Sequence, residues 1–177
     1  MKLLGITPGD DRDLAPWFEA LGRAGLAELL VREPDRSESE LASVVEEATR
    51  WIRRVVVHNK CAGAEDVARE FGLQVHSRAL SCHSKDDVDA AFAGGATYCL
   101  LSPIWRPTSK PDDTRKPLGL AGFERAARGR AVYALGGVAP DHMPLLRQQN
   151  VYGVAVLGGL FGTSDPAAAA IALRAYL

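Results

Sequence analysis

Short runs of strand-forming residues alternate with helix-forming segments along the whole of this 177-residue chain. The runs with strand character cover residues 2–7, 27–32, 55–59, 97–101, 132–135 and 154–157. The segments with helical character cover residues 14–24, 37–51, 64–71, 84–93, 120–127, 140–149 and 166–177. Such alternation predicts an α/β fold in which parallel strands are joined by crossover helices.

One stretch interrupts this alternation. Residues 73–83 are extended in character, and nothing within them has the length or period of a crossover helix. The stretch is therefore either one long strand or two strands that have lost the helix between them. Counted once, it gives about seven strands, one fewer than a closed barrel needs. We therefore expect a TIM (β/α)8-type barrel that is abridged around its fourth and fifth strands.

The composition favours a single domain over residues 1–177. With 47% hydrophobic residues, the chain can fill one core but is short for two ordinary domains. A formal net charge of -1 gives no field that would attract nucleic acid or an anionic membrane. The apolar segment 3–7 ends at Pro8 and is too short for a signal peptide or a membrane span. A cytoplasmic location is therefore expected.

The cysteines point to reduced thiols. Cys61, Cys82 and Cys99 are odd in number and widely spaced, and no Cys-x-x-Cys pair occurs. This pattern argues against both a disulfide framework and a structural zinc site. Cys99 lies within an apolar strand and is expected in the core.

Two strands end in paired glycines. Residues 132–135 precede Gly136 and Gly137, and residues 154–157 precede Gly158 and Gly159. In (β/α) barrels, the loops after the seventh and eighth strands commonly bind phosphate through unhindered backbone amides. The alternative is that the glycines only permit tight turns. On the first interpretation the chain handles a phosphorylated small molecule.

A set of motifs in this order resembles the thiamine-phosphate synthase and TenI superfamily. The similarity extends over residues 3–161, so a single barrel domain of this kind is expected over residues 1–177. The matching segments are Val31-Arg32-Glu33, Ser81-Cys82-His83-Ser84, Ser102-Pro103-Ile104-Trp105, Thr108-Ser109-Lys110 and Ala134-Leu135-Gly136-Gly137-Val138.

The resemblance implies an activity and a set of site residues. Synthases of this superfamily join a pyrimidine diphosphate to a thiazole phosphate and release pyrophosphate, so the protein must neutralise charge on the departing group. The residues implied at the diphosphate are Arg32, Asn59, Ser81 and Lys110, with Ser109 in the same loop as Lys110. The residues implied at the thiazole phosphate are Gly136, Gly137, Gly158 and Gly159. Lys110 and Ser81 are our candidates for a catalytic role.

The chain departs from the superfamily where magnesium is usually held. The resemblance implies Mg²⁺, but Lys60 stands where the first metal-binding aspartate is usual, and the segment carrying the second is cut short after His76. We therefore predict no metal site, and we hypothesise that Lys60 supplies a fixed positive charge beside the substrate. The histidine typical of TenI tautomerases is replaced by Pro103.

Three other histidines are expected near the carboxyl ends of strands. His58, His76 and His83 are each either structural residues or acid–base groups, and we include His83 among the catalytic candidates. A zinc site is disfavoured because no carboxylate or thiolate stands at a supporting spacing.

The loop 106–117 is either a lid whose cations close over a diphosphate or a solvated charged tip. Trp105 is either packing or a cover for the ligand ring.

Three functions stay open from the sequence alone. The favoured one is the synthase reaction; the others are a phosphate-ligand-binding regulatory protein without catalysis and a TenI-like isomerase that uses His83 or His76. A homodimer is a further hypothesis, because a missing crossover helix would expose apolar surface that a second copy covers.

Overall fold

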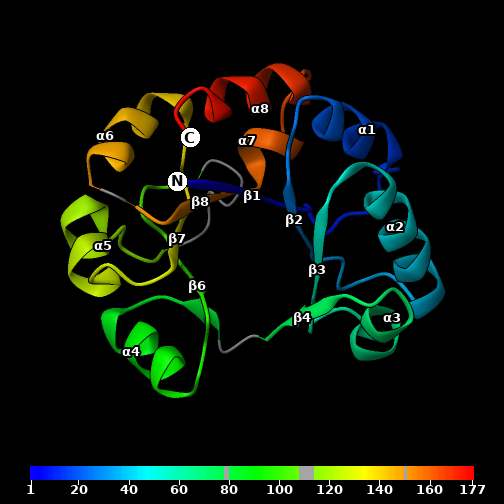
Figure 1. Cartoon of the computed structure of the whole chain (residues 1–177), viewed down its shortest axis with the longest axis horizontal. Coiled ribbons are helices and arrows are strands. Elements are labelled where there is room, and N and C mark those ends of the chain that lie inside the picture. Colours follow the sequence, from blue (N-terminus) through cyan, green and yellow to red (C-terminus); the bar gives the residue numbers. More distant parts are fainter. Residues whose placement is uncertain (78–79, 108–113, 150) are drawn as a thin grey trace.

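Eight parallel strands form one curled sheet in the computed structural model, which describes residues 1–77, 80–107, 114–149 and 151–177. The strands are β1 (Lys2–Ile6), β2 (Glu28–Val31), β3 (Arg54–His58), β4 (Gln74–His76), β5 (Ser81–Cys82), β6 (Cys99–Leu101), β7 (Val132–Leu135) and β8 (Gly153–Val156). The helices are α1 (Ala15–Arg23), α2 (Glu38–Trp51), α3 (Ala64–Glu70), α4 (Lys85–Ala93), α5 (Gly119–Ala127), α6 (Met143–Gln148), α7 (Gly158–Phe161) and α8 (Pro166–Arg174). The helices surround the strands as an outer ring (Figure 1).

The strand order makes the sheet a barrel with a seam. β1 pairs in parallel with both β2 and β8, so the first and last strands of the chain are neighbours. The order β4-β3-β2-β1-β8-β7-β6-β5 leaves β4 and β5 at the two edges. Only residues 77–80 separate these edge strands, which leaves no room for a crossover helix. The stretch 73–83 is therefore two strands without their helix, and the predicted abridged barrel is confirmed.

The predicted helices are confirmed, with local differences. Ser37 Oγ accepts from the Glu40 amide at 3.4 Å, and Glu40 Oε2 accepts from the Ser37 amide at 2.8 Å, which is a capping box at the start of α2. The segment expected as one helix over 140–149 is a 3₁₀ turn, Pro140–His142, followed by α6. The short helix α7 was not expected, since it begins at the glycine pair after β8.

Two apolar clusters fill the molecule. The larger one lies between strands and helices and contains large side chains such as Phe18, Leu41 and Phe161. The smaller one fills the barrel interior with Leu4, Leu30, Val56, Leu100 and Ala155. All three cysteines are buried and free, as their spacing predicts. Among the helices of the described ranges, none is long and apolar enough to cross a membrane.

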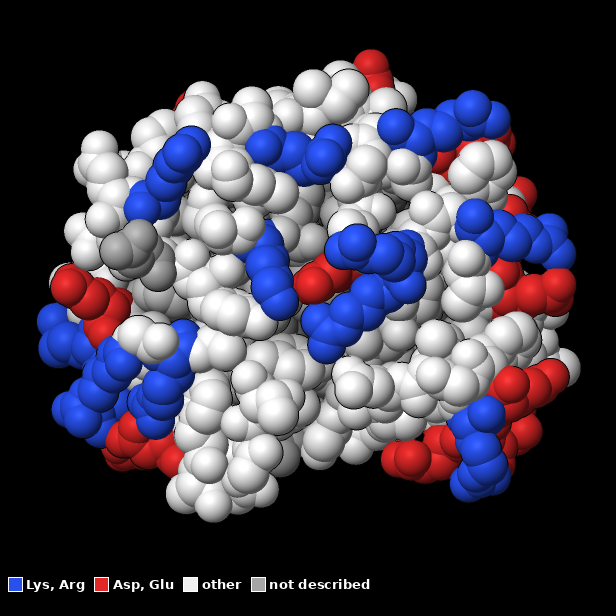
Figure 2. Space-filling view, viewed as in Figure 1, with Lys and Arg blue, Asp and Glu red and all other residues white. Residues whose placement is uncertain are grey.

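A polar cluster closes the amino-terminal end of the barrel. Glu28 begins β2 and lies beside Arg54, which begins β3. The Glu28 carboxylate accepts from the Tyr133 hydroxyl at 2.6 Å and pairs with Arg54 Nη1 at 3.3 Å and Lys2 Nζ at 3.9 Å. Burial, together with the hydrogen bond to Glu28, raises the pKa of Tyr133. In Figure 2, basic side chains surround an acidic group in the middle of the visible face. Basic and acidic side chains lie next to one another near the edge of that face.

We predict that Glu28→Gln destabilises the fold by about 1–3 kcal/mol, because Arg54 and Lys2 would lose their partner in a half-buried setting. Urea unfolding of the variant and the parent chain measures this difference. Glu46→Gln is the control, since Glu46 pairs with Arg50 on an exposed helix face. It should cost about 0.5 kcal/mol or less. Equal losses in the two variants would contradict a stabilising role for the Glu28 cluster.

Candidate functional site

A cavity of about 750 Å³ opens at the carboxyl ends of the strands. It gathers most of the residues that the sequence singled out, from segments far apart in the chain. Those that line it are Arg32, Lys60, Ser81, His83, Gly136, Gly137, Gly158 and Gly159. Asn59 is exposed and is not among its lining residues. Ser109 and Lys110 lie outside the described residues.

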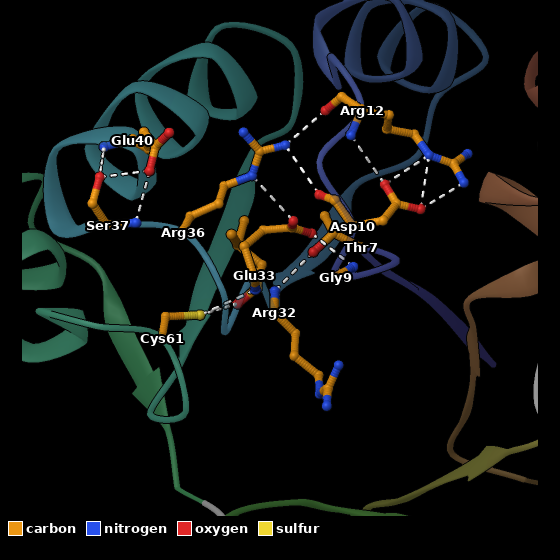
Figure 3. A network of polar contacts seen from close by, with 11 residues as sticks. Thr7, Gly9, Asp10, Arg12, Arg32, Glu33, Arg36, Ser37, Glu40 and Cys61 are labelled. Atoms are coloured by element: carbon orange, nitrogen blue, oxygen red, sulfur yellow. Dashed lines mark hydrogen bonds and ion pairs between the residues drawn. The ribbon is translucent and has the colours of Figure 1, made fainter.

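A hydrogen-bond network fixes the backbone at Arg32. The Arg32 amide donates to Thr7 Oγ1 at 2.8 Å, which ties the end of β2 to the end of β1. The next residue, Glu33, is buried; its carboxylate accepts from the Gly9 amide at 3.0 Å and from Arg36 Nε at 3.2 Å. Figure 3 shows the Arg32 side chain pointing away from this network. Arg32 is therefore anchored through its backbone while its guanidinium lines the cavity.

The same network reaches the loops after β1 and β8. Arg36 Nη2 donates to the carbonyls of Asp10 at 3.2 Å and Arg12 at 2.6 Å. Arg12 in turn binds the Asp10 carboxylate and donates to the Phe161 carbonyl of α7 at 2.5 Å. The Arg12 hydrogen bond holds the pKa of Asp10 below its usual range. These contacts, of which Figure 3 draws those between Asp10, Arg12 and Arg36, link the loops after β1 and β2 to α7.

A tight turn after β3 sets the position of Lys60. The amide of Lys60 donates to His58 Nδ1 at 3.0 Å, and the amide of Cys61 donates to the His58 carbonyl at 3.0 Å. His58 is buried, and because its Nδ1 is an acceptor, its proton in the neutral form lies on Nε2. The amide of Asn59 donates to the His76 carbonyl at 3.1 Å, which aligns this turn with β4.

His76 bridges the seam between β4 and β5. It is fully buried, its Nδ1 lies 2.9 Å from the Tyr98 hydroxyl, and its Nε2 lies 3.4 Å from Ser81 Oγ. Its ring centroid is 5.2 Å from that of His58. Burial, with a smaller contribution from His58, lowers the pKa of His76 to about 4. His76 is therefore neutral at pH 7, and it orients Ser81, whose side chain lines the cavity.

His83 lies at the rim, in contact with two groups of the β6 side. Its Nδ1 lies 2.9 Å from the Ser102 carbonyl oxygen. Arg115 Nη1 lies 2.9 Å from Nε2. The amide of His83 donates to Asp87 Oδ2 at 2.8 Å, and this bond is the main reason that the pKa of Asp87 is lowered.

The first glycine pair has a structural requirement as well as a place in the cavity. Gly136 and Gly137 have φ of +92° and +65°, which side chains rarely adopt. A Cβ on Gly137 would lie 2.7 Å from Trp105 Cβ and 2.8 Å from the Arg106 carbonyl. The turn interpretation of this pair is therefore supported by geometry. It does not conflict with the phosphate interpretation, since both residues also line the cavity.

The second glycine pair lies beside the first. Gly158 and Gly159 begin α7 directly after β8, and β8 pairs with β7. Both pairs line the same cavity, as two successive strand ends of a barrel should. The pairing of β7 with β8 therefore brings the two glycine pairs to neighbouring strand ends of one cavity.

A stacked aromatic pair was missed by the sequence interpretation. Trp105 and His142 lie with ring centroids 4.0 Å apart and planes at 8°. His142 Nδ1 accepts from the Ala139 amide at 3.3 Å, and both rings line the cavity. The segment 140–149 reads as a helix, and only the 3₁₀ turn at its start brings His142 to the site. A histidine just after a strand-end glycine pair was the available signal.

The cavity does not fit the magnesium ion that the resemblance implies. Within the described parts of the chain, no aspartate or glutamate lines it. Over the same residues, no group of three His, Cys, Asp or Glu side chains is arranged to hold a metal ion. Magnesium prefers near-octahedral oxygen ligands that include carboxylates. The donors at this cavity are instead cations, imidazoles, hydroxyls and backbone groups.

The shifted pKa of His76 gives a prediction about stability and pH. The folded pKa of about 4 lies below the ordinary histidine value of 6.5, so the unfolded chain binds the proton more readily. Stability present above pH 6.5 is therefore lost as pH falls toward 4, by about 2 kcal/mol at pH 4.5. Urea unfolding at pH 7.5 and 4.5 measures the loss, which should be smaller in His76→Gln. An unchanged loss in His76→Gln would contradict the assignment.

Comparison with known proteins agrees with the geometry. The family model described as thiamine monophosphate synthase matches residues 63–160. The thiamine-phosphate synthase of Salinispora tropica is 35% identical over 96 residues, which are 53% of this chain and 46% of that protein. That of Thioalkalivibrio sulfidiphilus is 27% identical over 189 residues, covering 95% of this chain and 90% of that protein. The match to the Salinispora tropica protein thus spans about half the length of that relative.

Solved structures share the fold. Thiamine phosphate pyrophosphorylase from Pyrococcus furiosus superposes with a TM-score of 0.75 at 18% identity, covering 99% of this chain and 94% of that one. The enzyme of that name from Bacteroides thetaiotaomicron gives 0.71 at 22% identity, covering 98% and 96%. The family match covers more than half of the sequence and agrees with the resemblance noted in its motifs. This chain belongs to the thiamine monophosphate synthase family.

Proposed function

We propose that this protein binds a pyrimidine diphosphate and a thiazole phosphate in its strand-end cavity and joins them with release of pyrophosphate, as a step of thiamine biosynthesis. The observation that carries the proposal is the convergence of two glycine pairs and a set of basic residues on one cavity. Membership of the family supports the same substrates.

The two ends of the cavity suit the two substrates. The amides at Gly136, Gly137, Gly158 and Gly159 suit the thiazole phosphate, because unhindered backbone donors bind such oxygens well. Arg32 offers a bidentate fork to the diphosphate, and Lys60 and the Ser81 hydroxyl line the same cavity. Ser109 and Lys110, which lie outside the described residues, stay predictions as further diphosphate ligands.

The proposed reaction needs charge neutralisation more than proton transfer. The C–O bond between the pyrimidine methylene and the diphosphate breaks, the bonding pair leaves with pyrophosphate, and a new bond joins the methylene to the thiazole. Fixed cations stabilise the charge that develops on the leaving group. The Trp105 and His142 rings offer flat surfaces against which a heterocycle can lie.

A second candidate function is phosphate-ligand binding without catalysis. The observation that favours it is the lining itself, in which the described residues include no carboxylate for a metal. A TenI-like isomerase that uses His83 or His76 is a third outcome for the assay. Cytoplasmic location and homodimerisation stay predictions; light scattering across micromolar concentrations tests the second.

We predict that Arg32→Gln weakens binding of the pyrimidine diphosphate by about tenfold or more, because a bidentate charged contact is lost. Its effect on the thiazole phosphate should be smaller, since the glycine pairs lie on other strands. Calorimetric titration with each substrate measures both affinities. Arg23→Gln, which removes an exposed charge on α1, is the control and should leave both unchanged. Equal weakening of the two ligands would contradict the division of the cavity.

The reaction itself is tested by mixing both substrates and following pyrophosphate release together with the coupled product. Coupling supports the synthase. Binding of both ligands without turnover identifies the non-catalytic binder. Exchange of a thiazole proton without coupling identifies the isomerase. Absence of binding by either substrate would overturn the assignment.

A further inference from the structure

The charge that lines the cavity is one-sided. Arg32, Lys60, Arg106 and Arg115 line it, whereas no acidic side chain does within the described ranges. Arg32 follows β2, Lys60 follows β3, and the other two follow β6, so positive charge stands on opposite sides of the opening. Such an arrangement in a concave site favours an anion that carries several charges.

The acidic side chains near the rim are already used by the protein. The Glu33 carboxylate is buried and is held by the Gly9 amide and Arg36, on the far side of the backbone from the Arg32 side chain (Figure 3). Asp10 binds Arg12, and Asp87 accepts from the His83 amide. Turning any of these toward the cavity would break contacts that hold the loops together. None of them is therefore available as a metal ligand.

Lys60 is held at the cavity wall by its backbone. The turn at His58 fixes the Lys60 amide at 3.0 Å from a buried imidazole nitrogen. Directly beside it, the amide of Asn59 donates to the carbonyl of His76 on β4. The lysine side chain thus starts from a rigid base, and it lines the cavity. A positive charge is therefore built into this wall of the cavity.

We propose that this cavity binds a diphosphate group without a divalent cation, with Arg32, Lys60, Arg106 and Arg115 compensating its charge directly. The inference rests on the proposed function, because it concerns the same cavity and its diphosphate ligand. A divalent cation at this position would face like charges and no carboxylate from the described lining, whereas the metal-free anion presents its full negative charge to the basic groups.

The test is titration calorimetry of the full chain with inorganic pyrophosphate, once in EDTA and once in excess magnesium chloride. We expect the affinity in EDTA to equal or exceed that in magnesium, and to fall steeply as salt is added, because the contact is between charges. Binding that requires magnesium overturns the proposal. Absence of pyrophosphate binding in both buffers overturns it as well.

Substitution of Lys60 separates its charge from the rest of the cavity. Lys60→Gln should weaken pyrophosphate binding in EDTA by about tenfold. Lys60→Asp should weaken it further in EDTA and regain part of the affinity in magnesium, since it supplies the carboxylate that the wall lacks. Arg69→Gln, an exposed cation on the helix after the same strand, is the matched control and should change affinity less than about twofold.

Two further measurements keep the inference distinct from the proposed function. Thiazole phosphate is titrated in the same buffers; if it binds while pyrophosphate needs magnesium, the inference fails and the proposed function stands. Asp112 and Asp113 lie outside the described residues, so D112N/D113N is titrated too. Magnesium-dependent binding that this variant abolishes would overturn the inference and assign the metal to those residues.

Discussion

The pairing of β1 with both β2 and β8 is the constraint on which the site depends. It places the first and last thirds of the chain side by side, so that Arg32 and the Gly158 pair line one cavity although more than a hundred residues separate them in the sequence. Because all eight strands are parallel, every segment that follows a strand emerges at the same end of the barrel. At the other end, Glu28 accepts from the Tyr133 hydroxyl and pairs with Arg54.

The buried carboxylate of Glu33 converts this topology into a fixed geometry. A buried charge is costly unless its hydrogen bonds are satisfied, and Glu33 accepts from a backbone amide and from Arg36. Arg36 Nη2 then donates to the carbonyls of Asp10 and Arg12. The loops after β1 and β2 are thereby linked, and the guanidinium of Arg32 is left for the cavity. One polar network therefore links two neighbouring loops, and it keeps the structural carboxylate of Glu33 apart from the Arg32 guanidinium that lines the cavity.

The sequence predicted what depends on local pattern. Alternating runs identify an abridged barrel, the Ser37 capping box marks the start of α2, and the glycine pairs mark two strand ends that meet at one cavity. It did not predict the stacking of Trp105 on His142 or the burial of Glu33. Both depend on contacts between residues distant in the sequence, and neither produces a periodic pattern in the sequence. The helix α7 was missed because two glycines at its start read as a turn and because it spans a single turn.

The short connection at the seam between β4 and β5 and the basic side chain of Lys60 affect the same wall of the cavity. β3 pairs with β4 so that His58 lies opposite His76, and the shortened connection follows directly after His76. The resemblance noted in the sequence implies acidic metal ligands after these two strands. Losing one acid alone would leave a weak metal site, and adding a lysine beside the remaining acid would oppose the ion. Here only residues 77–80 connect β4 to β5, and Lys60 follows the adjoining strand β3. Both features make this wall of the cavity less suited to a metal ion. His76 contacts Ser81 and Tyr98 across the seam, and in its neutral state it adds no further positive charge to a wall that is already basic.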